Sequence, residues 1–304
     1  MALTEKQWEE KLAQGRELAS PCRLCPRRCG AIRFPETGQA TLGVCKTGDR
    51  GIISSAGPHF GEEPPLVGTN GSGTIFFAHC NLKCIYCLNY YLAHLGEGRE
   101  VSDAELSRIM LRLQARGCHN INLVSPTHLL PNILAAVKLA AEQGLRIPLV
   151  YNTGGYDSLA AIGLLDGVVD IYLPDMKYGD AAPAEEFSQA PDYPQANFAL
   201  VKEMHRQVGD LVLDEDGVAL RGLIVRHLVL PNGLAGTKRI MEFIAQEISK
   251  DTYVNIMDQY QPYYRAIGHP QLGRRITRWE YRQAIALARK AGLTRIPARH
   301  RFWL

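Results

Sequence analysis

The sequence predicts an α/β fold: a partial (βα)6 barrel of the TIM type, preceded by a small Cys-rich N-terminal module. From residue 74 onward, short β-rich segments and helix-like segments alternate six times, as in parallel strands joined by helical crossovers. Before that point the chain is instead rich in Cys, Gly and Pro. Its 304 residues are enough for both parts. We therefore expect two domains, residues 1–73 and 74–304.

The N-terminal module is expected to begin with a helix over residues 4–18. Trp8 and Leu12 fall on one face of that helix and give it an apolar side to pack against the rest of the chain. The Cys-rich stretch that follows has few residues that could build a core, and a short module of this kind often needs a metal to fold.

Four cysteines of this module have the spacing of metal ligands. They form a CxxCxxxC run with a fourth cysteine sixteen residues further on, and they are Cys22, Cys25, Cys29 and Cys45. Four thiolates suit either a closed tetrahedral zinc site or a second, fully ligated 4Fe-4S cluster. The need of a small module for a structural metal favours zinc, but the spacing is compatible with both.

Six short apolar runs with β-branched or aromatic residues are the expected strands of the barrel. They are residues 74–78, 121–124, 148–151, 168–173, 223–229 and 253–257. Residues 210–221 are expected to add a hairpin around Asp216 and Gly217, a dipeptide typical of tight turns. Because the barrel strands are parallel, a ligand is expected at their carboxyl ends.

Helical patterns fill the intervals between these strands. Ser102 is a typical N-cap for the first of them, which ends near Gly117, and Pro131 opens the second, which ends near Gly144. The remaining helices are expected at residues 157–165, 195–207, 236–249 and 277–291. Residues 178–195 are expected to form a long loop that helps to cover the mouth of the barrel.

Composition narrows the class of protein. Hydrophobic residues make up 46% and charged residues 21%, as in a soluble globular protein. The 34 basic and 31 acidic residues are too balanced to indicate a nucleic-acid or membrane surface. Residues 1–10 have no apolar segment of signal-peptide length, and no later stretch is apolar enough to span a bilayer. We therefore expect a cytoplasmic protein.

The most informative motif directly follows the first barrel strand. Cys80, Cys84 and Cys87 have the spacing CxxxCxxC. A cubane iron-sulfur cluster normally takes four thiolates, so three would leave one iron free to bind a substrate. The alternatives are ordinary core cysteines or part of a zinc site. The nearest histidines, His79 and His94, lack the paired spacing of zinc fingers, which favours iron-sulfur.

Polar residues recur where the other strands end. Ser125 and Thr127 follow the second strand and Asn152 and Thr153 the third; Asp175 and Lys177 follow the fourth, and Arg226 and His227 lie in the fifth. Each tract alone is ordinary turn or capping chemistry. Their recurrence at one end of a barrel indicates a functional site.

Several runs together resemble a known family. They are CRLCPRRCG, HFGEEPPLVGTNGSGTIFFAHCNLKCIYC, NLVSPTHLLP, YNTGGY, LPDMKY, RGLIVRHLVLPNGLAGT and NIMDQYQP. They look like radical S-adenosylmethionine (SAM) proteins related to the pyruvate formate-lyase activating enzyme, and the resemblance covers nearly the whole chain. It implies a 4Fe-4S cluster on the three cysteines, with SAM chelated to the open iron. A low-potential donor such as flavodoxin or ferredoxin would reduce the cluster.

The resemblance also implies roles for single residues. Tyr86 is placed like the residue near the adenine of SAM. Ser125 and Thr127 stand where the relatives have a Gly-Gly-Glu tract that holds the methionine amino group. Asn152, with Thr153, replaces an Asp that helps to bind a monovalent cation, so recognition is expected to differ at both places.

Three further residues complete the predicted site. Asp175 and Lys177 match an Asp-Leu-Lys tract of the relatives, and we expect them to be catalytic. Lys177 is also expected to meet the carboxylate of SAM or of the substrate. Arg226 is a further cofactor-binding candidate. His128 and His227 are weaker candidates, because a lone histidine at a strand end is more often a capping group.

The function that follows is reductive cleavage of SAM to a 5'-deoxyadenosyl radical, which abstracts hydrogen from a substrate. Glycyl-radical activation of a partner protein is one reading of the resemblance. Radical modification of a small molecule or peptide is the alternative, because the segments around the barrel mouth are long enough to close it. A non-catalytic iron-sulfur electron carrier is a third class, which the many polar strand ends disfavour.

Overall fold

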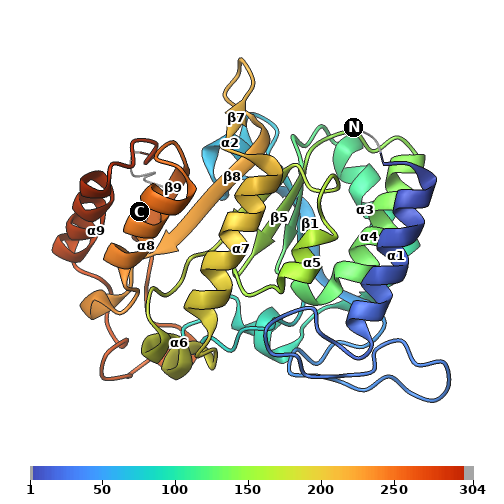
Figure 1. The fold of residues 1–304 in the computed structure, drawn as a ribbon, viewed down its shortest axis with the longest axis horizontal. Coiled ribbons are helices and arrows are strands. Elements are labelled where there is room, and N and C mark those ends of the chain that lie inside the picture. The colour runs from blue at the N-terminus through green and yellow to red at the C-terminus, as the bar shows by residue number, and fades with distance from the viewer. Residues whose placement is uncertain (1–2, 298–304) are drawn as a thin grey trace.

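The computed structural model describes residues 3–297, so the outermost residues of both predicted domains lie outside the described part. Six parallel strands lie side by side in one sheet (Figure 1). They are, in spatial order, β2 (Ser72–Phe77), β4 (Ile121–Val124), β5 (Leu149–Thr153), β6 (Ile171–Pro174), β8 (Ala219–Leu228) and β9 (Tyr253–Met257). The predicted α/β fold with a parallel sheet, as in a partial TIM barrel, is confirmed.

Antiparallel strands extend this sheet. β1 (Gly51–His59) pairs along β2, and β3 (Arg99–Val101) pairs with the start of β1. β7 (Val212–Leu213) forms the predicted hairpin with β8. β1 was not expected from the sequence, because its polar centre hides the apolar pattern of a strand. Since β1 lies in the same sheet as β2, the sheet crosses residue 73, and the division into two domains there stays a prediction.

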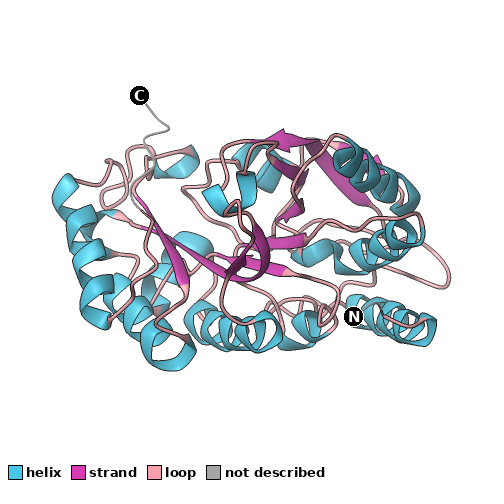
Figure 2. Ribbon diagram, turned by 90° about the horizontal axis from the view of Figure 1, so that it is seen from above, coloured by secondary structure: helices cyan, strands magenta, loops and turns pink. Residues whose placement is uncertain are grey.

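Helices line the outer side of the strands (Figure 2). The longer ones are α1 (Glu5–Ala19), α3 (Asp103–Ala115), α4 (Leu130–Glu142), α7 (Tyr193–Val208) and α9 (Arg278–Ala291). The shorter ones are α2 (Pro64–Val67), α5 (Leu159–Gly163), α6 (Ala181–Ser188) and α8 (Thr237–Phe243), with single turns η1 (Tyr91–Leu95), η2 (Thr127–Leu129), η3 (Pro231–Gly233), η4 (Ile244–Ile248) and η5 (Tyr264–Ala266). The segment expected as a loop at 178–195 therefore contains α6, which corrects that prediction.

The helix starts follow the predicted capping chemistry. Ser102 accepts a hydrogen bond from the backbone of Glu105, whose side chain returns one to Ser102, so both form a capping box. α9 begins with the same arrangement of Thr277 and Glu280. No helix among residues 3–297 is both long and apolar enough to cross a bilayer.

Successive side chains along each strand point to opposite faces of the sheet, and this divides the core into two layers. Tyr151 and Leu223 face the helices and belong to the main core. Val150 and Ile224, one position away, pack on the other side, inside the barrel, around Leu66 of α2. This small apolar cluster fills part of the barrel interior. The polar strand ends lie beyond it, toward the carboxyl ends of the strands.

Candidate functional site

The three cysteines of the CxxxCxxC motif lie in the loop after β2. All three are free, and Cys84 is buried. The backbone N–H of Leu82 donates to Cys80 Sγ (3.4 Å), and Ser188 Oγ donates to Cys84 Sγ (3.0 Å). Burial and the neighbouring thiols of Cys84 and Cys80 raise the pKa of Cys87 to about 12. The three sulfurs therefore lie close enough to repel one another as thiolates.

This mutual repulsion is what a metal cluster relieves, because it takes up the negative charge of its ligands. Burial, and then the thiol of Cys84, raise the pKa of Cys80 in the same way. Three clustered thiols with hydrogen-bond donors aimed at two of the sulfurs therefore fit a 4Fe-4S cluster with one iron left open.

Segments distant in the sequence hold the motif loop in place. The backbone N–H of Ile85 donates to the carbonyl of Phe187 in α6 (2.9 Å). The backbone N–H groups of Arg265 and Ala266 both donate to the carbonyl of Ile85 (2.9 and 3.0 Å). The ring of Tyr86 is buried and packs edge-on against those of Tyr178 and Tyr260. The loop is thus fixed on both sides by α6 and η5.

Four of the predicted site residues meet in one network at the strand ends. Asp175 Oδ2 accepts from Lys177 Nζ (2.6 Å), and its Oδ1 accepts from Arg226 Nε (2.9 Å). Arg226 Nη2 donates to Asn152 Oδ1 (2.5 Å). The network brings β5, β6 and β8 together. The polar residues that recur at the strand ends in the sequence are therefore neighbours in the structure.

The charges of this network stabilise one another. Burial by itself raises the pKa of Asp175, but Arg226 and Lys177 outweigh it and hold that pKa below its usual value. Burial lowers the pKa of Lys177, whereas the carboxylate of Asp175 and then the thiol of Cys84 raise it, and the increase dominates. Lys177 therefore stays a cation next to the cysteine motif.

Two carboxyl groups that the sequence analysis missed complete the network. Glu62 Oε2 lies 3.6 Å from Arg226 Nη1, and Glu63 Oε1 accepts from Asn255 Nδ2 of β9 (3.0 Å). Glu63 Oε2 and Asn152 Nδ2 are buried and have no hydrogen-bond partner among the described residues. The only local signal was the Glu-Glu pair in the run GEEPP, which lies outside the strand-helix units.

Substituting Glu63 is expected to change how stability depends on pH. Burial raises the pKa of Glu63 above its usual 4.5, outweighing Arg226. As pH rises through 4.5 the unfolded chain loses this proton before the folded chain does, so the folded state loses stability up to the folded pKa. Glu63→Gln should therefore gain about 1.4 kcal/mol relative to the native protein for each pH unit between the unfolded and folded pKa of Glu63.

Urea unfolding on both sides of pH 4.5 measures this difference. Glu215→Gln, on an exposed turn, is the matched control and should stay within about 0.5 kcal/mol of the native protein at every pH. A Glu63→Gln variant whose relative stability is constant across the range would contradict the expectation.

The comparisons with known proteins bear on this site. The sequence model of the radical SAM superfamily matches residues 74–181, from β2 through the cysteine motif to the start of α6. An uncharacterised protein of Methanocaldococcus jannaschii is 31% identical over 293 residues, which are 93% of this chain and 78% of the relative. The chain belongs to the radical SAM superfamily. It is thus an enzyme of a superfamily that uses a 4Fe-4S cluster and SAM and needs a reductant.

Solved structures of radical SAM proteins resemble the chain more distantly. A radical SAM methyltransferase from Sphaerobacter thermophilus is 16% identical with a TM-score of 0.49, over 74% of this chain and 65% of that one. SuiB of Streptococcus suis, bound to its precursor peptide SuiA, is 13% identical with a TM-score of 0.47, over 70% and 43%. The chain spans less than two thirds of either structure.

The remaining predicted SAM contacts lie around a buried carboxyl group. Thr153 Oγ1 donates to Asp157 Oδ2 (2.6 Å), and Tyr151 OH donates to Asp157 Oδ1 (2.8 Å). Thr127 Oγ1 lies 3.4 Å from Thr153 Oγ1. Ser125 has a left-handed backbone (φ 58°) and its N–H donates to the carbonyl of Asn152. Asp157 was not predicted, although it fixes the Thr153 hydroxyl of this radical SAM protein.

Gly155 is the glycine of this site that tolerates a side chain least. Its φ is +76°, and a Cβ would lie 2.2 Å from the carbonyl of Asp175 and 2.3 Å from Asn197 Nδ2. Gly155→Ala is expected to cost about 3 kcal/mol or more, from left-handed strain and overpacking together. Gly163→Ala is the control, because nothing lies within 4 Å of its Cβ. Thermal unfolding compares the two; equal melting temperatures would contradict the expected strain.

The four N-terminal cysteines of this radical SAM chain also come near one another. Cys22, Cys25 and Cys45 are buried and Cys29 is exposed. The thiols of Cys29 and Cys45 both act on the pKa of Cys22, which burial raises. Among residues 3–297, no three Cys, His, Asp or Glu side chains gather tightly enough to hold a single metal ion. Cys118 is buried and belongs to the main core, as expected for a small apolar residue.

Proposed function

We propose that the chain is a radical SAM enzyme in which Cys80, Cys84 and Cys87 hold the 4Fe-4S cluster. The observation that carries this proposal is the gathering of three thiols after the first barrel strand, beside the cation of Lys177. When bound, the cluster supplies the electron that cleaves SAM to methionine and a 5'-deoxyadenosyl radical.

The strand ends are proposed to bind and orient SAM and the substrate. Lys177 and Arg226 offer cationic donors for a carboxylate, and Asp175 holds both in place. Tyr86 is proposed to pack near the adenine, in the aromatic group beside the motif loop. The further proposed SAM contacts are Ser125, Thr127, Asn152 and Thr153. The burial of Thr127, Asn152 and Thr153 favours a site from which water is excluded.

Two classes of substrate are proposed. Glycyl-radical activation of a partner protein is one candidate and rests on the resemblance to the activating enzymes. Radical modification of a small molecule or peptide is the second. Glu63 Oε2 and Asn152 Nδ2 favour it, because these buried polar atoms without protein partners can bind a polar group of a small substrate. The proposed reductant is flavodoxin or ferredoxin. The N-terminal cysteines are proposed to hold zinc or a second cluster.

The test is turnover of SAM by the reconstituted protein. We expect anaerobic protein with iron, sulfide, dithionite and SAM to form 5'-deoxyadenosine and methionine, measured by liquid chromatography. The same sample without dithionite is the control and should form neither. An intact cluster that yields no product with dithionite would contradict the proposal and would favour an iron-sulfur electron carrier instead.

A further inference from the structure

One side chain links the two cysteine groups. Asn81 lies in the motif loop and is buried. Its Oδ1 is 3.8 Å from Cys80 Sγ, and the same side chain interacts with the thiol of Cys25. A ligand of each group therefore contacts the same amide, although the two cysteines are far apart in the sequence.

A second bridge runs through Arg27, between two of the N-terminal cysteines in the sequence. Its Nε donates to the carbonyl of Asn81, and its Nη2 donates to the carbonyl of Ser188 (3.2 Å). The Ser188 hydroxyl in turn donates to Cys84 Sγ. The N-terminal loops and the motif loop thus share one edge of the molecule, below the carboxyl ends of the strands in Figure 1.

The N-terminal group itself is prepared for four negative thiolates. The guanidinium of Arg33 is 1% exposed, donates to the carbonyls of Gly48 and His128, and interacts electrostatically with Cys45 and Cys22. Such a buried cation offsets the charge of a thiolate site. Gly43 leaves room for one ligand, since a Cβ there would lie 2.4 Å from Cys29 Sγ.

We propose that Cys22, Cys25, Cys29 and Cys45 hold a second 4Fe-4S cluster that passes electrons to the first one through Asn81. The proposal rests on the proposed cluster at the CxxxCxxC motif. In each transfer the second cluster is oxidised by one electron and the first is reduced by one, and no bond forms or breaks. A low-potential donor protein, or dithionite, reduces the second cluster again.

The position of the four cysteines favours a redox centre over zinc. Cys29 is exposed, and Cys25 is buried and interacts with Asn81 of the motif loop. The group therefore has one ligand at the surface, where a donor protein can dock, and another at the motif loop. Zinc has one redox state in proteins and would make no use of this placement.

Metal analysis of variants tests the second cluster. The triple variant Cys80→Ala, Cys84→Ala, Cys87→Ala should retain about four irons and four sulfides per chain after reconstitution, held by the N-terminal group. If it fails to fold, the native protein must contain about eight irons and no zinc. About one zinc per chain, or no metal in the triple variant, would overturn the proposal. SAM cleavage by the native protein is scored separately, so the proposed function can fail while the second cluster stands.

Electron paramagnetic resonance and stopped-flow reduction test the relay. Two reduced clusters linked through one side chain should broaden each other's signals in the native protein. Asn81→Leu should weaken that interaction and slow the reduction of the first cluster by at least about tenfold. Asn70→Leu, at an exposed position, is the control and should leave both unchanged. An unchanged reduction rate in Asn81→Leu, with both clusters present, would rule out this route.

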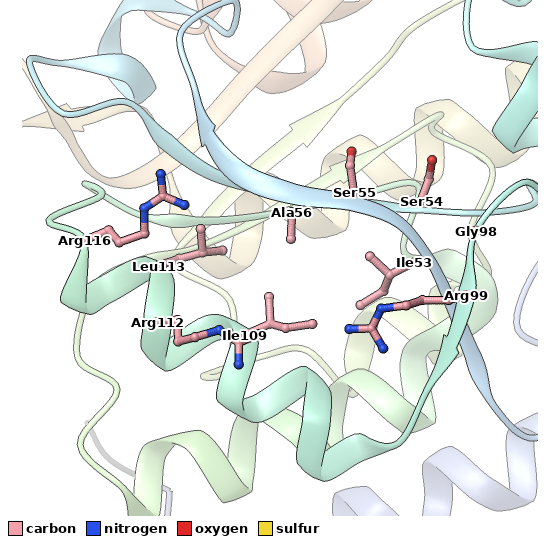
Figure 3. A pocket seen from close by; sticks show the side chains of 10 residues that line it. All are labelled: Ile53, Ser54, Ser55, Ala56, Gly98, Arg99, Ile109, Arg112, Leu113 and Arg116. Atoms are coloured by element: carbon pink, nitrogen blue, oxygen red, sulfur yellow. The ribbon is translucent and has the colours of Figure 1, made fainter.

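A separate observation concerns a groove between β1 and α3 (Figure 3). The cavity has a volume of about 460 Å³. Ile53 of β1 and, opposite it, Ile109 and Leu113 of α3 give the groove an apolar lining, to which Arg112 and Arg116 of α3 add positive charge. Neither of these two arginines forms an ion pair within the described part of the chain. The groove is therefore both apolar and cationic.

The groove borders a free strand edge. β3 pairs only with Gly51–Ile53 of β1, so the outer edge of Ser54–Ala56 has no strand partner among residues 3–297. These residues are exposed. A free edge of this kind can accept an extended peptide through main-chain hydrogen bonds, with side chains seated in neighbouring pockets.

We infer that this groove docks an extended acidic peptide segment as an added strand on β1. Main-chain pairing along Ser54–Ala56 supplies the contact, the apolar lining seats alternate side chains, and Arg112 and Arg116 select acidic ones. β1 also pairs with the strand that leads into the cysteine motif, and the N–H of Ala78 donates to the carbonyl of Ile52. The docked segment would thus lie beside the start of the motif loop.

Fluorescence anisotropy with labelled peptides tests the docking site. A short peptide of alternating Glu and Val residues should bind, and one of alternating Lys and Val should not. Arg112→Glu with Arg116→Glu should weaken binding by at least about tenfold, whereas the control Arg108→Glu on the same helix should not. An N-methylated Glu-Val peptide cannot pair with a strand edge and should lose binding. Equal binding of the methylated peptide, or of the double variant, would overturn the inference.

Discussion

Replacing Cys84 by alanine is expected to remove the radical SAM cluster. Its thiol is the central one of the three, because it helps to raise the pKa of both Cys80 and Cys87. Ser188 also donates a hydrogen bond to its sulfur. Two thiolates hold a cubane poorly, so iron at this motif should be lost on reconstitution. Formation of 5'-deoxyadenosine should fall by at least about 10³-fold, because the cofactor supplies the chemistry.

The matched control is Cys118→Ala. Cys118 is buried like Cys84 but lies in the core away from the motif. This change should cost about 1 kcal/mol of stability and leave both the iron content and SAM cleavage intact. Iron and sulfide analysis, with product chromatography, compares the two variants. Native iron content and turnover in Cys84→Ala would show that another residue holds the cluster.

The sequence predicted the barrel well where periodicity was strong. The strands at residues 121–124 and 253–257 coincide with β4 and β9. The misses have local causes. The centre of β1 is Ser-Ser-Ala-Gly, a run of small residues that lacks the apolar alternation of a half-buried strand. α6 carries Pro183 near its start and is only eight residues long, so it reads as a loop.

The residues of the site were likewise predictable only in part. Asp175, Lys177 and Arg226 could be predicted because parallel strands bring their carboxyl ends together. Glu63 could not, because it meets Asn255 across 192 residues of sequence. Ser188 reaches Cys84 across 104 residues from a helix that the sequence does not reveal. Such partners depend on how elements fold over one another and leave no local pattern.

Arg226→Met is expected to be the most destabilising change in the charged network. It removes one of the two cations that bind Asp175, the donor to Asn152 Oδ1, and one of the two basic partners of Glu62. Breaking a buried pair from one side typically costs about 3–5 kcal/mol, because the remaining charge stays buried. Urea unfolding at neutral pH measures the loss. Arg221→Met, at an exposed position of the same strand, is the control and should cost less than about 1 kcal/mol.

The dependence on pH separates lost charge pairing from lost packing. Because Arg226 and Lys177 hold the pKa of Asp175 below 3.8, its ionised form stabilises the native protein above that pH and this contribution is lost as pH falls. The deficit of Arg226→Met should therefore shrink in acid, and adding Asp175→Asn should restore part of the stability at neutral pH. A deficit that stays the same at all pH values, and that Asp175→Asn does not relieve, would mean that Arg226 acts through packing alone.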